Sequence, residues 1–169
     1  MVHPLVSQLR FARGEFQRSL EGITDEEARK RFMPMNCISW MVGHLAAQEQ
    51  RYWCDLAQGE VVSQRVYDLT AYGKPGTTPP LEDMWADWTA ITAQADVFFE
   101  TLTLDRLREF LLHRGKLVDE SIGTMLQRNI YHYWYHICES QAVRQMLGHT
   151  DLPEFVGDFG EDAAYRPER

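Results

Sequence analysis

Apolar residues recur at intervals of three and four positions along four long stretches of the chain. Residues with this spacing share one face of a helix, so each stretch is predicted to form an amphipathic helix. The predicted helices run from Pro4 to a stop at Gly22, over 38–57, over 81–102, and from just after Ser121 to about 147. Four helices of this length are enough to enclose one hydrophobic core.

Shorter elements are predicted between these helices. Thr24 and Glu27 have the spacing of a capping box, in which each side chain bonds the backbone N–H of the other residue. This pattern predicts a short helix over 24–31, and a second short helix is predicted over 103–110. Residues 113–116 are predicted to form a turn, with brief extended residues on either side as one option, and no stretch of the chain shows the alternation typical of a strand.

Residues 59–80 form a long polar connection that is rich in Gly, Pro and Thr. Connections of this length are unusual in compact domains unless they have a function or join distant ends. Tyr67 and Tyr72 lie in this connection and are expected to fold back over the helices. The whole pattern predicts an all-α protein, a four-helix bundle with short extra helices and one long connection after the second helix. We expect one domain over residues 1–169, with a loose tail from about residue 160.

The charge and composition exclude several classes of protein. A net charge of −8 without a basic stripe argues against nucleic acid or an anionic membrane surface as a partner. No stretch approaches the roughly 18 apolar residues that a membrane-spanning helix needs, and the first residues show no signal-peptide pattern. The three cysteines do not predict a disulfide framework. Cys54 and Cys138 are interpreted as small buried residues, and Cys37 is not expected to act as a ligand or nucleophile. Together these features predict a cytoplasmic protein.

Two histidines, His132 and His136, lie four residues apart in the last predicted helix. Positions i and i+4 share one helix face, about 5–6 Å apart at Cβ, so two imidazoles placed there can bind one metal ion. His44 on the second long helix is the candidate third ligand, because metal sites in bundles are built from side chains on facing helices. Spacing alone leaves open the commoner alternative, a chance pair of histidines. The other histidines of the chain have no partner at ligand spacing: His3, His113 and His149.

A set of three neutral imidazoles leaves coordination positions open for water or substrate. Such open sites are typical of catalytic rather than structural metal centres. Imidazole accepts several divalent transition metals. We expect Zn²⁺ first, with Ni²⁺, Fe²⁺, Co²⁺ and Mn²⁺ as alternatives.

Further polar residues border the predicted site. Glu139 follows His136 by three residues and is a candidate ligand, orienting partner or general base. The alternative is an exposed carboxylate paired with an arginine. Arg128 precedes His132 by one turn and is a candidate for binding an anionic substrate group, against the alternative of a solvated arginine. Gln48 is expected to line the same site.

The chain resembles the DinB/YfiT-like family of metalloproteins in its motifs and in the order of its helices. The motifs are the segment 38–45 with Trp53 further along, the segment 132–136 followed by Glu139, and the segment 144–149. The resemblance covers essentially the whole chain. It implies a bundle of up-down-down-up type, often a homodimer, with one divalent metal bound by three histidines. Matched onto this sequence, those ligands are His44, His132 and His136.

The resemblance and the residues together lead to two hypotheses for function. Relatives include S-transferases that use low-molecular-weight thiols such as bacillithiol or mycothiol, and a mycothiol-dependent maleylpyruvate isomerase. The first hypothesis is therefore a metal-dependent enzyme that activates a small thiol for transfer to an electrophile, with hydrolysis by metal-activated water as the alternative reaction. The second hypothesis is a non-catalytic dimeric bundle that binds a small ligand, in which the metal is structural or absent.

Overall fold

A computed structural model describes residues 3–165 of the chain. The structure is mostly helical, as the hydrophobic pattern predicts. No helix among these residues is long and apolar enough to cross a membrane. The elements in chain order are α1 (Pro4–Ser19), α2 (Asp25–Arg29), α3 (Ile38–Glu49), the π-helical segment η1 (Gln50–Leu56), α4 (Gln64–Leu69), α5 (Leu81–Phe99), the 3₁₀ turn η2 (Arg106–Arg108), β1 (Phe110–His113), β2 (Lys116–Ser121), α6 (Ile122–Met146) and α7 (Phe159–Asp162).

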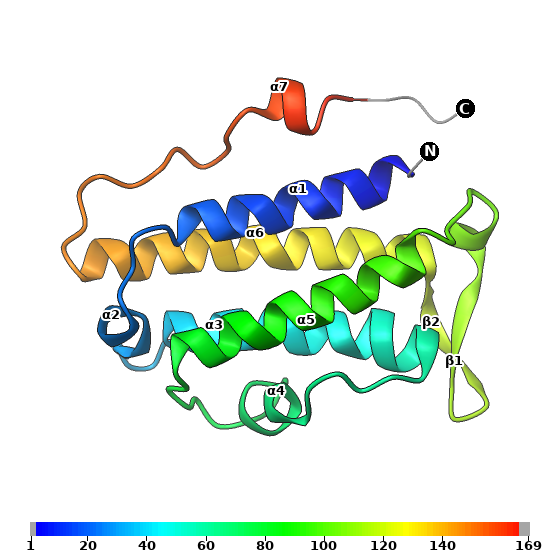
Figure 1. Cartoon of the computed structure of the whole chain (residues 1–169), viewed down its shortest axis with the longest axis horizontal. Coiled ribbons are helices and arrows are strands. Elements are labelled where there is room, and N and C mark those ends of the chain that lie inside the picture. The colour runs from blue at the N-terminus through cyan, green and yellow to red at the C-terminus, as the bar shows by residue number, and fades with distance from the viewer. Residues whose placement is uncertain (1–2, 166–169) are drawn as a thin grey trace.

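Four long helices lie side by side and enclose the core (Figure 1). α1 packs along α6, α3 packs along α5, and α3 also contacts α6. In Figure 1, α1 and α6 run in one direction along the molecule, whereas α3 and α5 run in the other. The largest fully buried side chains include Trp53, Tyr133 and Phe16, which come from three different elements. The contact between α3 and α6 matters most here, because these helices carry the predicted histidines.

The helix starts follow local capping chemistry. Thr24 and Glu27 form the predicted capping box at the start of α2. The Ser121 hydroxyl accepts a hydrogen bond from the Thr124 N–H and caps α6. Pro4 occupies the first turn of α1, where its missing N–H has no cost.

The all-α prediction holds broadly but is incomplete at one place, because the turn predicted at 113–116 joins two short strands. β1 and β2 form an antiparallel hairpin in which His113 pairs with Lys116, across the turn predicted at 113–116. Arg114 and Gly115 both have positive φ, at 50° and 78°, which is typical of the mirror-image turns that suit two-residue hairpins. Both strands are largely exposed, so no alternating apolar pattern marks them in the sequence. The short helix predicted over 103–110 is also wrong, because only the 3₁₀ turn η2 forms there before the chain enters β1.

Other boundaries differ in ways that affect the site. The helix predicted over 38–57 changes to π-helical hydrogen bonding at Gln50, and π-helical turns are frequent at functional sites. The long connection contains α4, which packs against α3. Part of the predicted tail is helical, in α7. This segment packs back on α1, where the Gln8 side chain donates a hydrogen bond to the backbone carbonyl of the buried Ala163. Tail residues 166–169 lie outside the described residues.

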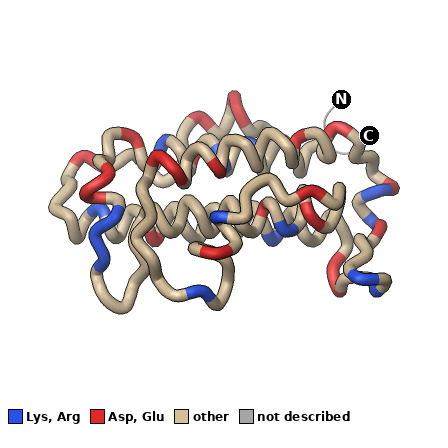
Figure 2. Tube along the Cα trace, turned by 60° about the horizontal axis from the view of Figure 1, so that its bottom comes forward, with Lys and Arg blue, Asp and Glu red and all other residues tan. Residues whose placement is uncertain are grey.

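Acidic and basic positions are interspersed along the chain (Figure 2). Acidic residues occur on most of the elements drawn there, and basic residues lie among them. Several are paired across elements, for example Arg65 with Asp87 and Arg10 with Glu100.

Candidate metal centre

The structure brings the three predicted histidines together. His44 comes from α3, and His132 and His136 come from successive turns of α6. One ligand atom from each ring lies within 4.8 Å of the others. The Nε2 atoms of His132 and His136 are 3.0 Å apart. His136 is buried, and the other two rings are half-buried. The i, i+4 spacing and the packing of α3 on α6 together produce this convergence.

Each ring is held by a hydrogen-bond partner at its Nδ1 atom. His44 Nδ1 lies 2.8 Å from the backbone carbonyl oxygen of Thr70. His132 Nδ1 lies 2.7 Å from Oε1 of Gln48, and His136 Nδ1 lies 2.8 Å from Oε2 of Glu139. The Thr70 carbonyl and the Glu139 carboxylate can only accept, so His44 and His136 donate from Nδ1–H. Gln48 presents its amide oxygen to His132, which donates to it in the same way.

This arrangement fits a bound cation. A neutral imidazole with its proton on Nδ1 presents a bare lone pair at Nε2. Bare nitrogens of His132 and His136 at 3.0 Å repel one another unless a cation lies between them. Partners that fix the Nδ1 tautomer and the ring orientation are the usual support of metal-binding histidines. The donor set therefore suits a divalent transition metal.

The electrostatic surroundings keep two of these rings neutral. Burial lowers the pKa of His44 to about 4, despite the opposing hydrogen bond to Thr70. Burial, together with the neighbouring His136 and His44, lowers the pKa of His132 to about 3. Neutral imidazole is the form that binds metals, so neither ring needs to lose a proton at neutral pH.

Trp40 restrains the ring of His44. The two rings are stacked, with centroids 4.5 Å apart and planes at 17°. Trp40 is itself buried. Stacking on one face and the Thr70 carbonyl at Nδ1 leave the His44 ring little freedom to turn.

A cavity of about 600 Å³ borders the histidine cluster and contains His44 and His132 in its wall. Its volume lies within the range typical of small-molecule sites. Arg51, Arg128 and His113 also line it. A larger cavity, of about 750 Å³, lies between the start of α1 and α7, and none of the three clustered histidines lines it. The smaller cavity is therefore the candidate substrate site, because it reaches the chemically distinctive side chains.

The hydrogen bonds and ion pairs of the other predicted site residues show how each of them is placed. Glu139 bonds His136 and thus occupies the orienting position among its three predicted roles. Arg128 forms an ion pair with Glu120 of β2, which raises the pKa of Arg128 and lowers the pKa of Glu120. Gln48 lines the cavity and bonds His132.

Several residues near the site were missed in the sequence. Thr70 acts through its backbone carbonyl, so its side-chain type gives no signal. His113 reaches the cavity from the hairpin, and the only hint of it was the turn beside it. The prediction that Cys138 is buried was wrong, because it is exposed on α6. Cys37 and Cys54 are buried.

The fold and the site define a helical protein with a three-histidine cluster suited to a divalent metal at the edge of a cavity. The family model for mycothiol-S-transferase matches residues 4–151, and the chain belongs to this family. The family is DinB/YfiT-like, which confirms the resemblance inferred from the motifs. The comparison with curated proteins gives no match.

Proposed function

We propose that this chain binds one divalent transition metal through His44, His132 and His136 and activates a low-molecular-weight thiol for transfer to an electrophile. The observation that carries this proposal is the convergence of one ring nitrogen from each of three histidines, whose rings are each bonded at Nδ1. Membership of the mycothiol-S-transferase family supports a thiol as the sulfur donor. Zn²⁺ is the metal we test first, followed by Ni²⁺, Fe²⁺, Co²⁺ and Mn²⁺.

The metal, when bound, supplies the positive charge that lowers the pKa of a thiol and makes the nucleophilic thiolate available near neutral pH. The protein contributes the fixed geometry. His44, His132 and His136 hold the ion, and Glu139 orients His136. The cavity beside His44 and His132, of about 600 Å³, lies within the volume range typical of small-molecule sites.

We further propose that the electrophile carries an anionic group bound by Arg128 and Arg51. Both side chains line the cavity beside His132. Arg128 is partly neutralised by Glu120. Arg51 has no hydrogen-bond or ion-pair partner within residues 3–165. An unpaired guanidinium beside a cavity is well suited to a carboxylate or phosphate.

Metal analysis tests the site directly. The purified chain should hold close to one equivalent of a transition metal, and His132→Ala should lose it. His149→Ala is the matched control, because His149 bonds Glu27 and Arg144 outside the cluster. If His132→Ala kept the metal, or if the wild-type chain bound none when Zn²⁺ was supplied, the proposed site would be wrong.

A reaction panel then tests the chemistry. The metal-loaded chain is mixed with several small thiols and a generic electrophile, and product is measured with and without thiol. Thiol-dependent product is expected. Product that forms equally well without thiol would favour hydrolysis by metal-activated water. A folded, metal-bound chain without turnover would favour the non-catalytic alternative.

Other features of the family remain part of the proposal. The directions of the four long helices support the up-down-down-up bundle. The homodimer, the single domain over 1–169 and the cytoplasmic location are predictions from the resemblance and the sequence.

A further inference from the structure

The three candidate ligands differ in how firmly their Nδ1 partners fix the proton. The Thr70 backbone carbonyl and the Glu139 carboxylate present only acceptor atoms to His44 and His136. The partner of His132 is the Gln48 amide. An amide can present either its oxygen or its NH₂ group, so Gln48 alone does not decide which nitrogen of His132 carries the proton.

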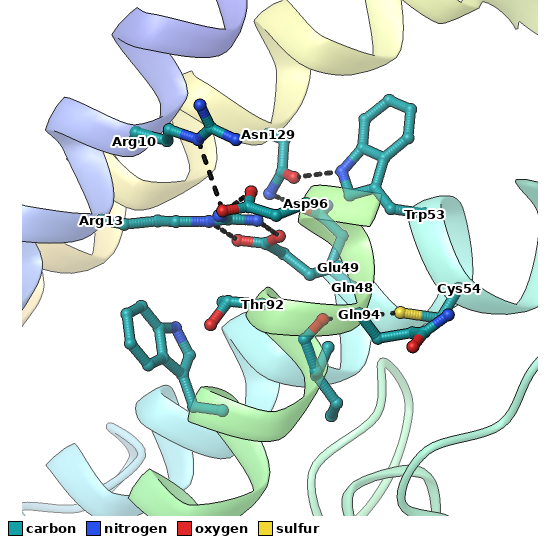
Figure 3. A network of polar contacts seen from close by, with 12 residues as sticks. Arg10, Arg13, Gln48, Glu49, Trp53, Cys54, Thr92, Gln94, Asp96 and Asn129 are labelled. Carbon is teal, nitrogen blue, oxygen red and sulfur yellow. Dashed lines mark hydrogen bonds and ion pairs between the residues drawn. The ribbon is translucent and has the colours of Figure 1, made fainter. Parts of the chain in front are cut away.

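A chain of hydrogen bonds from the buried Trp53 to His132 resolves this ambiguity, and Figure 3 shows its part from Trp53 through Asn129 to Gln48. Trp53 Nε1 donates to Asn129 Oδ1 over 2.7 Å, and Asn129 Nδ2 donates to Gln48 Oε1 over 3.1 Å. The same Gln48 oxygen lies 2.7 Å from His132 Nδ1. Trp53 and Asn129 are both fully buried. No water is needed to complete the chain from Trp53 to His132.

The donor or acceptor character of each side chain in this chain of hydrogen bonds fixes the orientation of the next side chain. An indole N–H can only donate, so Asn129 must turn its oxygen to Trp53. The NH₂ group of Asn129 then faces Gln48, so Gln48 must present its amide oxygen as the acceptor. That oxygen has two lone pairs and accepts from both Asn129 and His132. His132 therefore carries its proton on Nδ1 and leaves Nε2 bare toward His136.

We propose that Trp53 and Asn129 are positioning residues that fix the Nδ1–H tautomer of His132 through Gln48 and thereby prepare its Nε2 atom for metal binding. The inference rests on the proposed metal site. Without the indole donor, Asn129 and Gln48 are free to turn over. Gln48 would then offer NH₂ to His132, move the ring proton to Nε2, and block the lone pair that faces the metal position.

The tautomer is measurable in the metal-free chain. Two-bond ¹H–¹⁵N spectra of the ¹⁵N-labelled protein distinguish a ring protonated at Nδ1 from one protonated at Nε2. We expect His132 to be protonated at Nδ1 in the wild type. Protonation at Nε2 would overturn the inference. Because this measurement uses no metal, its result is separate from success or failure of the proposed function.

A substitution series tests the link to metal binding. Zn²⁺ affinity is measured by competition with a chelator, and folding by circular dichroism. Trp53→Phe should weaken Zn²⁺ binding by roughly tenfold or more, the usual effect of removing an outer partner of a metal ligand. Trp88→Phe is the matched control. Trp88 is also a buried indole, but it donates to the Tyr133 hydroxyl rather than toward a histidine.

A rescue variant makes the series specific. A carboxylate at position 48 accepts from both neighbours in any orientation. Gln48→Glu should therefore fix the His132 tautomer without the hydrogen bonds from Trp53 and Asn129. In that background Trp53→Phe should change Zn²⁺ affinity by less than about twofold, a difference well below the outer-partner effect. An equal loss in Trp88→Phe, or a loss that persists in Gln48→Glu, would show that Trp53 has only a general packing role. If Trp53→Phe fails to fold, the wild-type spectrum can still overturn the inference, since protonation of His132 at Nε2 would contradict it.

Discussion

Glu139 is the residue whose contribution to the site is easiest to isolate. Its Oε2 lies 2.8 Å from His136 Nδ1, and the ionised carboxylate accepts from the ring in either orientation. Glu139→Gln keeps the shape but introduces an amide that can also donate. We expect Zn²⁺ affinity to fall by about tenfold, with little change in the free energy of unfolding. Chelator competition and urea titration measure the two quantities.

A neighbouring change separates this effect from general disturbance of α6. Tyr135→Phe alters an exposed ring next to His136 and removes no bond to a candidate ligand. It should leave Zn²⁺ affinity within about twofold of wild type, a change too small for a lost outer partner. Equal Zn²⁺ affinities for Glu139→Gln and wild type would show that Glu139 does not support metal binding.

Glu27 gives a prediction at acid pH. The backbone N–H of Thr24, its hydroxyl and His149 lower the pKa of Glu27 to about 2, from an ordinary value of 4.5. A carboxyl whose pKa is lower in the folded state stabilises the fold above its unfolded pKa, and this contribution disappears as the pH falls. The melting temperature of wild type should therefore exceed that of Glu27→Gln above pH 4.5. The gap should close as the pH falls from 4.5 toward 2.

Thermal unfolding at several pH values measures this gap. Glu26→Gln is the control, because Glu26 lies in the same turn of α2 but makes no side-chain hydrogen bond within residues 3–165. Its melting temperature should follow wild type across the range. A gap for Glu27→Gln that stays constant with pH would contradict the assigned pKa.

At the scale of elements, one buried ion pair connects three of the long helices. Arg13 of α1 pairs with Glu49 of α3, and it also bonds Asp96 of α5 (Figure 3). Burial lowers the pKa of Arg13, but Glu49, Tyr133 and Asp96 together outweigh burial and raise the pKa above its ordinary value. Tyr133 of α6 donates to Glu49 as well, over 2.6 Å. Glu49 is fully buried, so it is the hydrogen-bond acceptor inside the core for both Arg13 and Tyr133.

Removal of Glu49 should be costly. Glu49→Ala removes the fully buried partner of Arg13 and leaves only the partly exposed Asp96 to pair with its charge, and we expect the free energy of unfolding to fall by about 3–5 kcal/mol. Urea unfolding measures it. Glu100→Ala breaks the exposed pair with Arg10 and should cost no more than about 1 kcal/mol. Similar losses for the two variants would show that the buried pair has no special role.

The elements could be predicted where the information is local. Apolar periodicity located the long helices, and the Thr24–Glu27 pattern located the start of α2. The turn of the hairpin was predicted, but its two sides were not recognised as paired strands, because they are largely exposed and carry no alternation. The change to π-helical bonding at Gln50 has no residue signal either.

In the site, too, local patterns were predictable from the sequence and contacts between distant residues were not. The pair His132 and His136 followed from spacing, and His44 from the logic of facing helices and the resemblance. Thr70 and Asn129 were not predicted, because their contacts join residues 26 and 81 positions apart and depend on packing. Sequence patterns can place ligands on a helix, but they do not report which distant carbonyl or amide holds each ring.

At the scale of the whole molecule, a metal at the cluster would join α3 to α6. The ligand positions form only when these two helices pack, so the metal should bind the folded chain in preference to the unfolded one. Binding of this kind stabilises the fold by mass action. At a free Zn²⁺ concentration about a hundred times the Kd, the free energy of unfolding should rise by about 2.7 kcal/mol.

For a domain of this size such a gain corresponds to roughly 5–10 °C in Tm. Thermal unfolding with chelator and with increasing Zn²⁺ measures it, and the gain should grow with the logarithm of the metal concentration. The metal-free chain should still unfold cooperatively, because Trp53, Tyr133 and Phe16 are buried in the hydrophobic core that the helices share. His132→Ala should lose the gain while His149→Ala keeps it. A gain of equal size in His132→Ala would place the stabilising metal elsewhere on the molecule.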